Sequence, residues 1–559
     1  MKSEVKRYLL IFPGIFTLVF YIISLSRIGF TSDDESATYT SRFLHDNSIL
    51  EASRALAKGT GRFYQEIFFT LSQIPYLVPK ENLLLSIGLN RSIQVSVFVI
   101  SVYWFMSTIF DRKIIFLSLS LMIFTIDLGG WYNALVSYPL WLSYGFSATF
   151  ISAGLLSSYL KRPHKLTGLL FLTVAVFSLL SYESHLFDLV LYIFVMLKHA
   201  NFGQRDFFTL IKRIKHLIAA YFTFLFVYLA IYWNFKSTYQ GNYSGSEIGT
   251  LQPDTVVGTL LRESFRHTSI KYYLSTPLYG INIDPLSQFR NLFGGDKLFL
   301  LIVVMVVIFL KFMINTNQGK PRFDKSETQR VVLEIACLIV VFISPSFLLA
   351  VSKKYQDSRD LSAYTTSLQS FVFLNIIVAI YLSHGLKHSF KNSNFTSWSF
   401  FRYITSFVLI LVFVSGSFVQ TGLNFRYIHE QVRNTQVWTL LEENHSQIES
   451  TQEGLEIRSS SISRVTRSGE YQFWGYFLDT QDRNFLLKPT DEKHPYRVEA
   501  ILSDCGYILI QTSFATIVRI YTSDNCDPKI LYLKTSSFEF SNEYIENLVK
   551  ASQNKFSFM

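Results

Sequence analysis

Residues 83–110 read LLLSIGLNRSIQVSVFVISVYWFMSTIF, and residues 111–126 read DRKIIFLSLSLMIFTI. The first stretch is long and apolar enough to cross a bilayer, because about 20 apolar residues span the hydrocarbon core as a helix. The charged turn Asp111, Arg112, Lys113 then separates it from a second apolar run. Apolar runs joined by short basic turns are typical of a polytopic helical membrane protein whose basic turns face the cytoplasm.

The composition agrees with a membrane protein. Apolar residues make up 49% of the 559 residues and charged residues only 16%, whereas an ordinary globular domain has about 25% charged residues. The net charge of +10 arises mostly in short loops between apolar runs, which indicates the positive-inside rule and not a nucleic-acid-binding face. The three cysteines exclude a dense disulfide scaffold and a zinc-ligand spacing.

Further apolar runs continue this alternation through a transmembrane region over residues 1–420. They are residues 8–25, 140–160, 166–197, 217–235, 298–314, 331–351, 368–382 and 403–418. The run 166–197 is too long for one span and has basic clusters at both ends, so we expect a hairpin. The predicted fold is an α-helical polytopic membrane protein with about eleven transmembrane helices and a cytoplasmic N-terminus.

Two long loops are expected on the outer face, at residues 26–82 and 236–297. In the first loop, Ser48 and Glu51 have the spacing of a helix-capping box, and Gly59 is expected to end that helix. Residues 67–78 are apolar but too short to cross, so we expect them to lie in the membrane interface.

Residues 421–559 differ from the rest because their apolar density drops. Residues 507–510 and 516–521 have the composition of strands, and residues 437–441 that of a helix. We therefore predict a small extracytoplasmic α/β domain. Cys505 and Cys526 fall in it and could form a disulfide outside the cytoplasm, two free thiols being the alternative.

The chain's acidic cluster, Asp33, Asp34 and Glu35, lies shortly after the first apolar run. Adjacent carboxylates repel one another, so one is expected to be protonated or matched to a cation. A carboxylate directed at a sugar or lipid hydroxyl can act as a general base. The alternative interpretation is a solvated turn in which Ser32 and Glu35 form a capping box.

Basic side chains of the outer loops are candidates for binding a leaving phosphate, because guanidinium and ammonium groups neutralise phosphate oxygens. The main candidates are Lys353, Lys354 and Arg359, and Arg62 and Arg266 are further candidates. Anchoring to lipid headgroups is the alternative role.

A second group of candidates lies close to the ends of the expected spans. Its members are Asp127, Trp131, Tyr132, Glu183, His185 and Asp188. Glu183 and His185 lie at the expected hairpin tip. Ionisable side chains near the membrane interior favour a functional role, and the two aromatic rings could stack on a sugar. The alternatives are a solvated tip, polar contacts at helix ends and an interfacial aromatic belt. Glu334, within a span, is expected to form a hydrogen bond inside the bundle.

The first span, the acidic pair just beyond it, the span number and the trailing outer domain resemble the GT-C superfamily of membrane glycosyltransferases. Gly61-Arg62 after the acidic pair is similar to the bacterial O-antigen glucosyltransferase (Gtr-type) branch, which modifies lipopolysaccharide. The resemblance implies a polyprenyl-phosphate sugar donor, a cell-envelope glycan or lipid acceptor, and an inverting reaction on the outer face of the inner (plasma) membrane. It also implies that Asp33 or Asp34 is the base and that Arg359 contacts the donor phosphate.

Other functions and cofactors stay open. The sequence contains no phosphate-binding P-loop, G-x-G-x-x-G, H-E-x-x-H or G-x-S-x-G motif. Asp33, Asp34 and Glu35 could coordinate Mg²⁺ or Mn²⁺, although nothing in their spacing requires a metal. A transporter or flippase for lipid-linked sugars should contain paired repeats, and none is found. A non-enzymatic envelope assembly protein would use residues 421–559 to bind its partner.

Overall fold

The computed structural model describes most of the helical part of the chain. The described residues are 49–128, 133–136, 140–239, 247–274, 277–278, 325–357 and 366–389, helical residues between 15 and 23 and between 408 and 420, and six strands between 456 and 533. The chain forms two compact units, Met1–His429 and Glu430–Met559. Each unit is described by itself.

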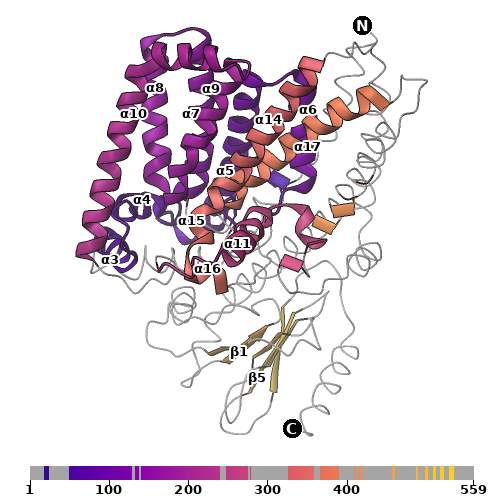
Figure 1. Cartoon of the computed structure of the whole chain (residues 1–559). Helices are drawn as coiled ribbons and strands as arrows, with labels where there is room; N and C mark the ends of the chain where they lie inside the picture. Colours follow the sequence, from indigo (N-terminus) through magenta and orange to yellow (C-terminus); the bar gives the residue numbers. More distant parts are fainter. Residues whose placement is uncertain are drawn as a thin grey trace. The chain divides into compact units, whose positions relative to one another are not determined.

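The regular elements of the first unit are helices in its described residues (Figure 1). Its elements are α3 (Ile49–Thr60), α4 (Gln65–Ser72), η1 (Ile74–Tyr76), α5 (Lys80–Ile109), α6 (Arg112–Thr125), α7 (Leu140–Lys161), α8 (Lys165–Ser181), η2 (Glu183–Phe187), α9 (Asp188–His199), α10 (Gln204–Thr238), α11 (Pro253–Phe265), η4 (Ser269–Tyr272), α14 (Lys325–Ile343), η6 (Ser344–Ser346), α15 (Phe347–Ala350), α16 (Lys353–Asp357) and α17 (Ser367–Ser389).

Three of the described helical stretches are long and apolar enough to cross a membrane: Leu85–Ile109, Arg205–Thr238 and Gln329–Ala350. They coincide with three of the runs that the sequence predicts as spans. Two further apolar helices are shorter, Lys165–Ser181 and Ser367–Ser383. These helices are compatible with the predicted membrane protein, and the number of spans stays a prediction.

The predicted hairpin over residues 166–197 is present as α8, η2 and α9. The helix breaks at Tyr182, whose backbone is extended, and a short 3-10 turn follows. The first residues of α9 contact the middle of α7, where Thr149 bonds Asp188, and its last residue, His199, contacts Ser157 further along α7. Because α9 thus runs parallel to α7 while α8 runs back along it, the chain reverses between α8 and α9 (Figure 1).

The turn after α3 corrects one sequence prediction. Gly59 lies inside the helix, and Gly61 adopts φ +69° one residue beyond its end. This left-handed conformation suits glycine, which has no Cβ to clash with the carbonyl. Gly61, and not Gly59, therefore ends the helix and directs the chain into Arg62.

The apolar segment 67–78 forms α4 and η1, and it has one exposed face. Ile67, Leu71, Ile74 and Leu77 are 64%, 51%, 59% and 52% exposed. A short helical segment with one exposed apolar face is typical of a helix that lies in the membrane interface. The interfacial location stays a prediction.

The second outer loop is more structured than the sequence indicates. α10 continues to Thr238, and α11 follows within the range expected to be a loop. The segment before α11 is joined to the start of α16, because Ile248 and Ser352 form an antiparallel bridge and the Gly249 amide donates to the Val351 carbonyl at 2.9 Å.

The second unit contains two three-stranded sheets, with strand orders β2-β1-β3 and β4-β5-β6. The strands are β1 (Glu456–Ser459), β2 (Leu486–Lys488), β3 (Val498–Ala500), β4 (Ile508–Gln511), β5 (Thr516–Tyr521) and β6 (Pro528–Leu533). β4 and β5 lie at the two runs that the sequence indicates as strands. The predicted helix at 437–441, Cys505 and Cys526 lie outside the described residues, so the α/β class stays a prediction.

Candidate functional site

Several loops that are far apart in the sequence meet at one end of the long helices (Figure 1). We call this region the loop layer and define it as residues 49–76, 183–187, 247–274 and 344–357. η2 contacts both η6 and α15, and the rings of Phe187 and Phe347 lie 5.5 Å apart. Segments that the sequence predicts on the outer face of the membrane therefore contact one another in the loop layer.

The loop layer contains a charged pair between Arg62 and Glu183. Arg62 Nε donates to Glu183 Oε1 at 2.6 Å, and the two side chains are 14% and 12% exposed. The Arg62 guanidinium also lies 5.3 Å from the centre of the Tyr182 ring, and Tyr232 donates to the same carboxylate at 3.5 Å. Positive-φ Gly61 and the break after α8 bring these side chains together across 121 residues of sequence.

Tyrosines surround this pair. Tyr64, Tyr182 and Tyr228 are buried in one apolar cluster, and Tyr232 packs against it. Burial raises the pKa of Tyr64 well above its usual value, and the negative charge of Glu183 raises it further. The Tyr64 hydroxyl therefore stays protonated and can donate a hydrogen bond. A carboxylate, a guanidinium and phenol groups together can bind the hydroxyl and phosphate groups of a sugar phosphate.

A second polar cluster centres on the Asp188 carboxylate. It accepts hydrogen bonds from Thr149 at 2.7 Å, Ser178 at 2.9 Å and Gln369 at 3.2 Å, and His185 Nδ1 lies 3.3 Å from Oδ2. All five side chains are almost completely buried. The interpretation of the hairpin tip as a solvated turn is therefore wrong for His185, which is 0% exposed.

Space around His185 is closed on the side away from Asp188. A Cβ built on Gly145 would lie 3.3 Å from His185 Nε2 and 1.9 Å from Ser181 Oγ. The Phe146 ring packs 4.8 Å from the imidazole. His185 is therefore enclosed by packed side chains, and the Asp188 cluster joins α7, α8, α9 and α17 by hydrogen bonds.

The helix α11 brings a third group of charges into the interior. Glu263 Oε2 lies 3.0 Å from Arg266, and Glu263 Oε1 lies 3.6 Å from Arg262. Arg262 also donates to the carbonyls of Tyr355 and Gln356, which fixes α16 against α11. The sequence indicated Arg266 as a candidate but missed Glu263 and Arg262, because the segment was expected to be a loop. The signal was Arg262 and Arg266 four residues apart, on one face of a helix.

Asp127 forms a buried ion pair that the sequence did not predict. Lys271 Nζ lies 2.5 Å from Asp127 Oδ2 and also donates to the Arg266 carbonyl at 2.9 Å. Gln420 donates to the other carboxylate oxygen at 3.0 Å. Asp127 therefore serves as an anchor between η4 and the end of α6. Elsewhere, Glu334 pairs with Lys198, in agreement with the expected hydrogen bond inside the bundle.

Of the two candidate phosphate-binding lysines, Lys353 is exposed and Lys354 is half-buried. The Lys353 side chain is 61% exposed and lies 3.4 Å from Glu247, and the Lys354 ammonium lies 5.5 Å from the centre of the Tyr355 ring. The other candidate residues lie outside the described part of the chain. They are Asp33, Asp34, Glu35, Trp131, Tyr132 and Arg359. Their roles stay predictions.

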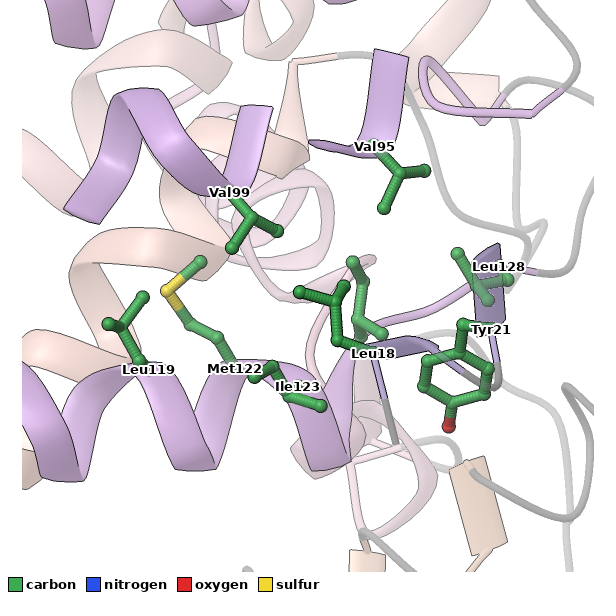
Figure 2. A pocket seen from close by; sticks show the side chains of 9 residues that line it. Leu18, Tyr21, Val95, Val99, Leu119, Met122, Ile123 and Leu128 are labelled. Carbon is green, nitrogen blue, oxygen red and sulfur yellow. The ribbon is translucent and has the colours of Figure 1, made fainter. Parts of the chain in front are cut away.

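A small apolar pocket lies between the N-terminal helical residues and α5 and α6. Figure 2 shows Leu18 and Tyr21 beside Val95 and Val99 of α5 and three side chains of α6. The pocket has room for about one water molecule and no polar lining. It therefore marks how the first helix packs, and it is too small for a sugar. Within the described residues, no three His, Cys, Asp or Glu side chains are grouped to hold a metal ion.

Comparison with known proteins gives no relative: no family model, no curated protein and no solved structure matches this chain.

Proposed function

We propose that the protein is a membrane glycosyltransferase that moves a sugar from a polyprenyl-phosphate donor to a cell-envelope glycan or lipid. The observation that carries this proposal is the Arg62–Glu183 pair, enclosed by tyrosines at the end of the bundle where the loops converge. Charged side chains that are mostly removed from water are costly, and such residues often belong to functional sites. The partly exposed pair can exchange its internal contact for contacts with a ligand.

The proposed reaction inverts the anomeric centre. Asp33 or Asp34 removes the proton of an acceptor hydroxyl, and the oxygen attacks the anomeric carbon. The bond from that carbon to the phosphate oxygen breaks, and the polyprenyl phosphate leaves with the electron pair. Cationic side chains close to the leaving oxygen would stabilise its developing charge. Mg²⁺ or Mn²⁺ held by the acidic cluster is an optional part of this proposal.

Basic residues at α16 are the proposed phosphate contacts. Arg262 joins α16 to α11, so Lys353 and Lys354 lie within the loop layer. The exposed Lys353 is accessible to a headgroup, Lys354 is half-buried beside it, and Arg359 follows a few residues later in the chain. Trp131 and Tyr132 are proposed to stack on the sugar.

The proposal includes a specific membrane arrangement. About eleven spans place the loop layer and the C-terminal α/β domain outside, and the N-terminus in the cytoplasm. This arrangement requires the basic turns and the loop layer to lie at opposite ends of the helices. The ends of α5, α7 and α9 meet each other, since Lys161 donates to Thr108 and Lys198 lies over Phe110. The loop layer lies at the other ends of these helices (Figure 1).

The test is a transfer assay with the purified full-length protein in lipid nanodiscs. Polyprenyl-phosphate sugars carrying different hexoses are supplied with candidate acceptors, and release of polyprenyl phosphate is measured. Asp33→Asn and Asp34→Asn should be compared with Asp206→Asn, an exposed residue at the start of α10. Loss of a general base lowers the rate by about 100-fold or more. Full transfer by both folded variants would show that the base is elsewhere.

A lipid-linked sugar transporter is the second candidate, because the buried Asp188 and His185 resemble the ionisable pairs of proton-coupled transporters. It predicts flux of the lipid-linked sugar across proteoliposomes that contain no acceptor. Flux without transfer would favour this function over the enzyme. A non-enzymatic assembly protein would instead lose its partner when residues 430–559 are deleted, with neither flux nor transfer.

A further inference from the structure

A cluster of basic side chains lies at the end of the bundle opposite to the loop layer. The basic face consists of Arg162, Lys165, Arg205, Lys212, Arg213 and Lys215. All six side chains are exposed. In the described part of the chain, none of the six forms a salt bridge with a carboxylate. Residues 204–216 contain one acidic residue, Asp206.

Two segments contribute to this face, and a contact between α8 and α10 joins them. Gly168 of α8 faces Leu217 of α10, because a Cβ built on Gly168 would lie 3.6 Å from Leu217 Cδ1. Both helices run from this end toward the loop layer (Figure 1). Lys165 lies one turn before Gly168, and Arg213 lies one turn before Leu217. Lys165 and Arg213 therefore both lie between this helix contact and the end of the bundle.

The backbone of α10 changes direction within the basic face. Ile214 has non-helical dihedral angles (φ −105°, ψ 15°) inside the helix, and its side chain is buried. Residues 204–213 are thus separated from the apolar span that follows. This first segment carries basic side chains and also the Phe208 ring, which is 54% exposed. An apolar ring among cations is typical of a segment that lies on an anionic membrane surface.

Exposed apolar side chains continue from the basic face along the bundle. Leu166, Leu169 and Leu170 of α8 are 57%, 61% and 44% exposed. The cations lie at the end of the bundle, and the exposed leucines follow them along α8. This arrangement matches the two parts of a phospholipid, its phosphate and its acyl chains. Phosphate oxygens supply the negative charge that the described residues do not provide.

We propose that the basic face binds an anionic phospholipid, with the phosphate between the α7–α8 turn and the first segment of α10. The acyl chains lie along Leu166, Leu169 and Leu170. This site is independent of the proposed glycosyltransferase reaction, because it lies at the other end of the helices. It would hold the protein at the charged surface of one leaflet.

The test measures lipid retention by the full-length protein with native mass spectrometry. The protein is exchanged into nanodiscs of phosphatidylcholine with either phosphatidylglycerol or a phospholipid that carries two phosphates. We expect wild type to retain anionic lipid over phosphatidylcholine. The triple variant Lys212→Gln, Arg213→Gln, Lys215→Gln should lower this preference by about 100-fold, since each surface cation contributes roughly fivefold.

Controls separate charge at this site from charge in general. Arg54→Gln with Lys58→Gln removes two exposed cations of α3 in the loop layer and should leave the preference unchanged. Retention of bound lipid should also fall when the salt concentration rises, because the exposed charges are screened. Stronger retention of the two-phosphate lipid would place both phosphates on the basic face. Equal retention of phosphatidylglycerol and phosphatidylcholine by wild type, or an unchanged preference in a folded triple variant, would overturn the proposal.

Discussion

The carboxylates of Asp188 and Glu183 lie five residues apart in the sequence and have opposite surroundings. Asp188 accepts hydrogen bonds from three neutral side chains on three helices, and it is almost completely buried. Glu183 pairs with Arg62 among tyrosines, and part of the pair reaches the surface. A carboxylate enclosed by the protein's own donors holds helices together. A carboxylate that shares one cation at the surface can release it to a ligand.

This difference separates stability from function in neighbouring residues. Variants in the Asp188 cluster should unfold the protein, and variants of the Arg62–Glu183 pair should chiefly affect binding. Substitutions on the two sides of this division should therefore differ in what they change.

Asp188→Ala should cause the largest loss of stability. The substitution leaves the donors of Thr149, Ser178 and Gln369 buried without their acceptor, and it opens a cavity between four helices. Removing one partner from a buried charged network costs about 3–5 kcal/mol. Thermal unfolding of the purified protein in detergent measures the effect. Asp206→Ala, on an exposed surface, is the matched control and should change the unfolding temperature little. An unfolding temperature equal to wild type would show that Asp188 does not lock the bundle.

Gly145→Ala tests the close contact between α7 and α8 next to this cluster. A Cβ at Gly145 would lie 2.6 Å from Ser181 Cβ, which neither helix can accommodate without moving. Overpacking of this kind costs about 1–3 kcal/mol. Gly258→Ala provides the control, since a Cβ there meets nothing within 4 Å. If both variants unfold at the same temperature, the helices are not as close as described.

The Arg62–Glu183 pair should give a smaller loss of stability and a larger loss of binding. A double-mutant cycle with Arg62→Met and Glu183→Gln measures the coupling between the two side chains. We expect a coupling free energy of about 1–2 kcal/mol, because the pair is mostly but not fully buried. Each single variant should weaken the binding of a polyprenyl-phosphate sugar at least tenfold, measured by scintillation proximity. Unaltered ligand binding in both folded single variants would restrict the pair to a structural role.

The smallest expected effect concerns Tyr64 and the stability of the folded protein at alkaline pH. Its folded-state pKa is raised, so the protonated hydroxyl stabilises the folded protein. This contribution is fully present below the unfolded-state pKa of about 10 and is lost as the pH rises above it. Wild type should therefore lose stability between about pH 10 and 12 more steeply than Tyr64→Phe does. Parallel stability curves for the two proteins would contradict the burial of this hydroxyl.

The sequence predicts the spans better than the contacts between them. Hydrophobic length indicates α5, α10 and α14, because the bilayer thickness sets how many apolar residues a helix needs. The break near Glu183 follows from the same rule, since a run of that length with basic residues at both ends has to reverse. These features depend on local composition, and they need no knowledge of neighbouring helices.

The roles of individual polar residues depend on partners that the sequence does not reveal. Asp188 and Gln369 are 181 residues apart, and nothing in either segment indicates that they meet. Arg262 and Glu263 have the composition of an exposed helix, and their burial results from packing of α11 against other helices. The end of α3 was placed at Gly59 because glycine often follows a helix. The structure shows that the second glycine, Gly61, takes the left-handed conformation.

The most direct test of the glycosyltransferase proposal is a structure of the full-length protein in nanodiscs with bound polyprenyl phosphate. We expect the phosphate in the loop layer, within hydrogen-bonding distance of Arg62 or of the lysines of α16, with the polyprenyl chain entering between helices. A loop layer without bound phosphate, with polyprenyl phosphate found only at the opposite end on the basic face near Arg213, would contradict the proposal.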